Sequence, residues 1–148
     1  MSEVVAFLEG TGADGRGRPI ETVLAFTPTE LERHHDFIQW LFPLAEPSRA
    51  VPGSPVLTPA DIAAVRGSIP AQANLRRAAA MMADFYDRSG HWLEPSDHNH
   101  LRITRIIRSL RLLAGPEPAD AFRSRIERRV ETAGATIGER TRAFWTQA

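Results

Sequence analysis

The chain has 148 residues and no cysteine, and its eighteen acidic residues balance eighteen basic ones, so the formal charge is zero. This length suits one domain that buries roughly two thirds of the surface exposed by its unfolded chain. The lack of cysteine excludes disulfides, thiolate metal sites and a cysteine nucleophile, and because every basic residue is an arginine, lysine-based catalysis is excluded as well.

The first predicted segment covers residues 1–26 and contains a glycine-rich loop. The apolar run Val4–Leu8 is short enough to form either a helix or a strand. The following residues, Gly10–Gly15, match the dinucleotide-binding pattern, but Arg16–Pro19 comes next instead of a helix, and no second strand follows. We therefore predict a flexible surface turn here and no nucleotide site.

Two helix starts are clear from their capping residues. Thr27 and Thr58 each precede a proline and are followed three residues later by an acid, which is the pattern of a capped helix with proline at its first position. From Thr27 the apolar spacing predicts one central helix that Pro43 ends. The proline-rich residues 44–57 predict an extended connection.

Further helices are predicted at about 59–67, 70–88, 98–113, 118–133 and 136–147. The third of these carries a core stripe at helical spacing, formed by Ile103, Ile106, Ile107, Leu110 and Leu113. No alternating strand pattern or internal repeat is visible. The sequence therefore predicts an all-α fold, a single compact domain of about six to seven helices joined by Pro/Gly-rich connections, with residues 27–148 as the helical core.

The charges are divided unevenly along the chain. Residues 1–61 hold four arginines and nine acids, a net charge of minus five, whereas residues 62–148 hold fourteen arginines and nine acids, a net charge of plus five. We expect the two parts to attract each other. The basic part lacks an aromatic-interleaved stripe or a known binding motif, so nucleic acid is not an expected partner.

Neither a targeting signal nor a membrane span is visible. The amino terminus lacks a basic segment followed by an apolar core, and no apolar run approaches the roughly 20 residues of a spanning helix. We expect a cytoplasmic protein without membrane insertion.

Four of the five histidines lie in two short clusters, His34-His35-Asp36 and Asp97-His98-Asn99-His100. Consecutive helical residues point about 100° apart, and neither cluster has the i, i+4 histidine pair of helical metal sites, so we predict no metal and no cofactor. His35 falls on the apolar stripe of the central helix. It is either a core histidine with a hydrogen-bond partner or a ligand contact.

Arg102 and Arg105 lie one turn apart on the helix that follows the second cluster. A guanidinium pair at this position can hold a peptide carboxylate or another anion, or it can pair with an acid of the negative segment such as Asp36 or Glu46. Trp40 is a candidate for an aromatic pocket wall. The candidate ligand-binding residues are thus His34, His35, Trp40, His98, Asn99, Arg102 and Arg105.

The same two regions carry a resemblance to a known family. The stretches His34–Leu44 and Asp97–Leu110 resemble, in order and without gaps, two conserved stretches of the opioid growth factor receptor family. The flanks Phe7–Gly10 and Ala143–Trp145 resemble that family too, so the similarity is expected to cover nearly the whole chain. The chain is identified as a stand-alone, bacterial-type member.

The resemblance implies a helical domain, which favours a helix for the apolar run near the amino terminus. Vertebrate members are described as receptors for an enkephalin-type opioid peptide, associated with the nuclear membrane. Phe37 departs from the family at a position where an aromatic hydroxyl is common. His100 departs where an amide is common, so polar roles at these two positions do not carry over.

We therefore predict a noncatalytic binding domain for a peptide, a protein partner or a small anionic ligand. One alternative is a small metal-assisted or histidine-dependent enzyme that acts on a metabolite. Another is a protein-interaction subunit that uses helix faces instead of a pocket. The sequence does not select among these ligands, and it leaves the oligomeric state open.

Overall fold

The computed structural model describes residues 2–148, and within them it contains nine helices and no strand, apart from two isolated bridges. The helices are α1 (Glu3–Glu9), α2 (Ile20–Leu24), α3 (Pro28–Arg33), α4 (Ile38–Leu41), α5 (Pro59–Arg66), α6 (Ile69–Arg88), α7 (His98–Leu113), α8 (Pro116–Ala133) and α9 (Glu139–Gln147). The predicted all-α class is confirmed. Six of the helices have seven or more residues, and the short ones account for the difference from the predicted number.

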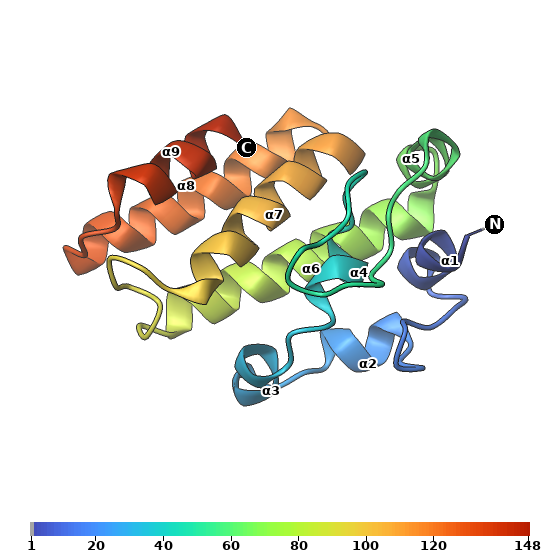
Figure 1. Ribbon diagram of the computed structural model, residues 1–148, viewed down its shortest axis with the longest axis horizontal. Helices are drawn as coiled ribbons and strands as arrows, with labels where there is room; N and C mark the ends of the chain where they lie inside the picture. Colours follow the sequence, from blue (N-terminus) through green and yellow to red (C-terminus); the bar gives the residue numbers. More distant parts are fainter. Residues whose placement is uncertain (1) are drawn as a thin grey trace.

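The longest helix, α6, crosses the middle of the molecule (Figure 1). Helices α1, α2 and α5 pack against it, and so does α8, which in turn packs against α7. Helix α9 lies along α7. The segment between α4 and α5 runs in front of these layers as an extended connection, as the prolines predict (Figure 1).

The core contains the predicted stripe of α7. All five of its apolar residues are buried, because they share one face of the helix and meet α8 and α9. Phe42, Tyr86 and Trp92 are also buried. Tyr86 and Trp92 pack edge to face, with ring centres 5.2 Å apart, so these aromatic residues belong to the core and not to a pocket wall.

The amino-terminal segment contributes to the same core. Val4, Val5, Phe7 and Leu8 are buried in α1, so this run is a helix and not the strand that a dinucleotide-binding unit requires. Gly10 ends the helix with a φ of 85°, a left-handed conformation that favours glycine.

The predicted single helix from Thr27 to Phe42 is wrong. Its first turn has the predicted capping box, in which Thr27 and Glu30 each accept a hydrogen bond from the other's backbone N–H. The chain leaves the helix at His34, which has extended backbone angles, and becomes helical again at Ile38. His35 therefore leaves the apolar stripe and is exposed. Of the two roles that the sequence left open for His35, the core histidine is wrong.

The opposite charges of the two parts of the chain meet in ion pairs. Arg77 of α6 binds Glu21 of α2 at 2.6 Å, and Arg108 of α7 binds Glu46 at 2.5 Å. Each pair joins an acid of residues 1–61 to an arginine of residues 62–148.

Candidate functional site

Arg102 of α7 connects the two histidine clusters through the backbone. Its Nη1 donates to the carbonyl oxygen of Leu31 at 2.8 Å, and its Nη2 donates to that of His34 at 2.5 Å. The same Nη2 lies 3.2 Å from His35 Nδ1, and the guanidinium carbon is 5.5 Å from the ring centre of Phe37. The last carbonyls of a helix lack partners within it, so Arg102 caps the end of α3, where the chain leaves the helix.

Asn99 forms the centre of a second network beside Arg102. Its side chain is fully buried, accepts a hydrogen bond from Tyr86 Oη at 3.1 Å, and donates from Nδ2 to Glu32 Oε2 at 3.1 Å. The Glu32 carboxylate also lies 2.9 Å from the Nε2 atoms of both His91 and His98. Two predicted site residues, His98 and Asn99, are thus held by a glutamate on α3.

The Glu32 network predicts a contribution to stability that is lost in acid. Burial raises the pKa of Glu32, but the hydrogen bonds from Asn99 and His91 and the nearby His98 outweigh it, so the pKa lies below its usual 4.5. A lowered carboxyl pKa stabilises the fold above the unfolded-state pKa, and this contribution is lost as pH falls through the folded-state pKa. Wild type should therefore exceed Glu32→Gln in unfolding free energy at pH 6, and the difference should shrink steadily toward pH 3.

Urea unfolding at several pH values measures this difference. Glu94→Gln is the matched control, since Glu94 is exposed and makes no ion pair within residues 2–148. A Glu32→Gln difference that stays constant from pH 6 to pH 3 would show that the carboxylate charge is not what stabilises the network.

Two predicted site residues, His34 and Trp40, have their rings outside the networks of Arg102 and Asn99. The ring of His34 stacks on Phe26 with ring centres 5.0 Å apart. Trp40 packs edge to face on Phe7 of α1, with ring centres 5.7 Å apart, and is almost fully buried. The structure therefore does not bring Trp40 to the other candidates, because the break between α3 and α4 turns it toward the amino-terminal helix.

A cavity of about 640 Å³ lies between one face of α7, helix α4 and the connection 44–51. We call it the α7 cavity. Helix α7 lines it with residues that share one face at helical spacing, namely His98, Leu101, Arg102, Thr104, Arg105 and Arg108. His35, Ile38 and Gln39 line it from the α3–α4 region. Four of the seven predicted site residues, His35, His98, Arg102 and Arg105, therefore meet at this cavity.

Arg105 has a different environment from Arg102. Its Nε donates to the carbonyl oxygen of Phe42 at 2.9 Å, but its Nη2 is buried without a hydrogen-bond partner. Burial, together with the positive charge of Arg108, lowers the pKa of Arg105 to about 10, although Glu46 opposes this. A buried guanidinium nitrogen without a partner is costly.

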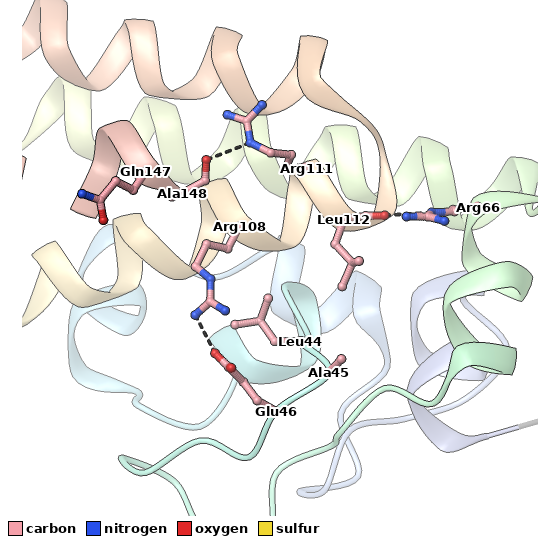
Figure 2. A pocket seen from close by; sticks show the side chains of 9 residues that line it. All are labelled: Leu44, Ala45, Glu46, Arg66, Arg108, Arg111, Leu112, Gln147 and Ala148. Atoms are coloured by element: carbon pink, nitrogen blue, oxygen red, sulfur yellow. Dashed lines mark hydrogen bonds and ion pairs between the residues drawn. The ribbon is translucent and has the colours of Figure 1, made fainter. Parts of the chain in front are cut away.

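Glu46 and Arg108 form an ion pair at the edge of the cavity. Figure 2 shows the two side chains pointing toward each other beside a neighbouring hollow of about 490 Å³. In that hollow, Arg66 and Arg111 point to the carbonyl oxygens of Leu112 and Ala148, to which they donate at 2.9 and 2.8 Å. The Glu46–Arg108 pair thus separates two hollows and ties the 44–57 connection to α7.

Sequence reasoning missed several residues of the α7 cavity. Gln39 stands out as the one polar residue in the run from Phe37 to Leu44, and it is buried with its Oε1 unpaired. Leu101 is an apolar residue off the core stripe, and it is 71% exposed at the cavity. Both exceptions to the local pattern are visible in the sequence and could have identified two walls of this cavity, one on α4 and one on α7.

The fold defines an all-helical domain with a cavity lined by arginines. Residues 26–91 match the opioid growth factor receptor conserved region. The chain is 38% identical to the opioid growth factor receptor of Mus musculus and to that of Rattus norvegicus, each over an alignment 98 positions long that covers 54% of this chain. It is 35% identical to opioid growth factor receptor-like protein 1 of Mus musculus over an alignment of the same length that covers 55% of this chain.

The predicted resemblance to the opioid growth factor receptor family is thus confirmed. It covers a smaller share of the chain than expected, because the matched region ends at residue 91 and the relatives cover about half of the chain. The chain in turn spans only 15%, 17% and 21% of the length of these three relatives. No solved structure matches the fold significantly.

Within residues 2–148, none of the helices is long and apolar enough to cross a membrane. No group of three or more histidine, aspartate or glutamate side chains in this part of the chain is arranged to hold a metal ion.

Proposed function

We propose that the domain is a noncatalytic binding module that takes a peptide segment into the α7 cavity. The observation that carries this proposal is the buried, unpaired Nη2 of Arg105, a residue that lines a cavity of about 640 Å³ where the two histidine clusters meet. That volume lies within the roughly 300–1,000 Å³ of typical ligand sites. The wall is mixed, with guanidinium groups beside Ile38, Leu44 and Leu101.

The relatives support a binding role, since they are named as receptors of an opioid growth factor. Their matched region is a small part of each relative, so their particular ligand does not follow for this chain. A peptide also suits the wall, because its backbone supplies polar groups and its side chains supply apolar surface.

An NMR titration with a pool of random N-acetylated hexapeptides tests the proposal. Amide signals of cavity residues should shift, and Leu101→Ala should weaken the apparent affinity about tenfold, because it removes apolar surface from the site. Ile69→Ala is the matched control, since Ile69 is another exposed aliphatic residue, 85% exposed, on a helix that does not line the cavity. Peptide binding that shifts no cavity signal, or no binding at all, would refute the proposed function.

A further inference from the structure

Two residues that line the α7 cavity, Gln39 and Arg105, each have a buried polar atom without a partner, and the two atoms need opposite kinds of partner. Gln39 is 7% exposed, and its Oε1 accepts no hydrogen bond. Arg105 Nη2 donates none. Buried polar groups are rarely left unpaired in proteins. A ligand that complements both atoms must offer an N–H donor to Gln39 and an oxygen acceptor to Arg105.

The charge of the wall favours a negatively charged acceptor. Four arginines, at positions 49, 102, 105 and 108, line the cavity, against the single carboxylate of Glu46. Arg102 donates its hydrogen bonds to backbone carbonyls, and Arg108 forms an ion pair with Glu46. Within residues 2–148, Arg105 forms no ion pair with a carboxylate and donates only to a carbonyl oxygen. A planar guanidinium matches a carboxylate better than it matches a point charge.

The apolar part of the wall favours an acid with a hydrocarbon side chain. Leu101 lies one turn before Arg105 on the same face of α7, and Ile38 and Val51 line the same cavity. A free inorganic anion would leave these groups without contacts. The carboxyl-terminal residue of a peptide combines an N–H, a carboxylate and a side chain within one unit.

We infer that the α7 cavity recognises the free carboxyl terminus of a peptide, with the carboxylate bound by Arg105 and Arg108 and the N–H of the last residue donated to Gln39 Oε1. This inference rests on the proposed function and names its ligand class. Both unpaired atoms are shielded from solvent. For the peptide terminus to reach them, the Gln39 and Arg105 side chains must rotate or residues 46–51 must move. Glu46 is the internal carboxylate that the ligand displaces from Arg108.

Two hexapeptide pools that differ only at the carboxyl end test the inference. One pool ends in a free carboxylate and the other in a carboxamide, and N-acetyl-leucine serves as a small acid. The free-acid pool should bind wild type at least about tenfold more tightly than the amide pool, the difference expected of a charge-assisted contact. In Arg105→Met this ratio should fall to about one. In Glu46→Gln, binding of the free-acid pool should tighten about threefold, because Arg108 loses its resident partner.

The outcomes separate this inference from the proposed function. If both pools shift the cavity signals equally, the carboxylate inference fails while the peptide-binding function stands. If neither pool shifts them, both fail. If N-acetyl-leucine binds as tightly as the free-acid pool, the inference fails as well, because the cavity then recognises a small carboxylate and not the end of a peptide. If Arg105→Met does not fold, Arg108→Met provides the second test, because Arg108 lies at the exposed edge of the cavity. An affinity ratio between the free-acid and amide pools that stays at the wild-type value in Arg108→Met would overturn the inference that Arg105 and Arg108 bind the carboxylate together.

Discussion

Arg102→Met should lower the free energy of unfolding by about 3 kcal/mol, because charged-donor hydrogen bonds contribute about 1.5–3 kcal/mol each and buried acceptors would lose their partner. The residue is 8% exposed and donates to the carbonyl oxygens of Leu31 and His34. Methionine keeps most of the apolar stem, so the loss reports mainly on the guanidinium. For a domain with a typical stability of about 5–15 kcal/mol this change is large.

Urea denaturation measures the effect, with Arg108→Met as the matched control on the same helix. Arg108 is exposed and pairs with Glu46, and such surface pairs contribute at most about 1 kcal/mol. Near-equal losses for the two variants would mean that Arg102 does not hold the end of α3. A loss confined to Arg102→Met, accompanied by perturbed amide signals at residues 31–37, would support its role in ending the helix.

The sequence predicted those helices whose ends depend on nearby residues. Helix α7 has its predicted bounds, because Asp97 caps the start by accepting from the Asn99 N–H and Gly115 follows the end. Helix α5 begins at its predicted capping box for the same reason. In each case the interaction that fixes the boundary spans only a few residues, so it is legible in the local sequence.

The break between α3 and α4 depends on a partner 71 residues away from Leu31, which no local pattern contains. The same limit applies to Arg102 and Arg105. Both are arginines at the border of one helix stripe, and the sequence predicts one shared role for them. Packing separates them, since Arg102 meets the carbonyls at the end of α3 while Arg105 faces a cavity with one nitrogen unpaired. Whether a guanidinium finds hydrogen-bond partners depends on residues that are distant in the sequence, so the local sequence does not predict it.

Asn99→Leu should lower the unfolding free energy by about 3 kcal/mol, since it leaves buried polar groups without partners. Asn99 accepts from the Tyr86 hydroxyl and donates to Glu32. Burial raises the pKa of the Tyr86 hydroxyl, so this group stays protonated and continues to need an acceptor. Leucine has a similar size but offers no acceptor, so the hydroxyl would stay buried and unpaired.

A double-mutant cycle with Tyr86→Phe isolates this contact. Tyr86→Phe alone should cost about 1 kcal/mol, and the double variant should lose less than the sum of the singles by about 1 kcal/mol, because removing both partners leaves no unpaired hydroxyl. His98→Leu is a suitable comparison, since His98 also binds Glu32 but is exposed, and it should cost less than about 1 kcal/mol. Additive losses in the cycle would show that Asn99 is not paired with Tyr86 and would return it to the list of ligand contacts.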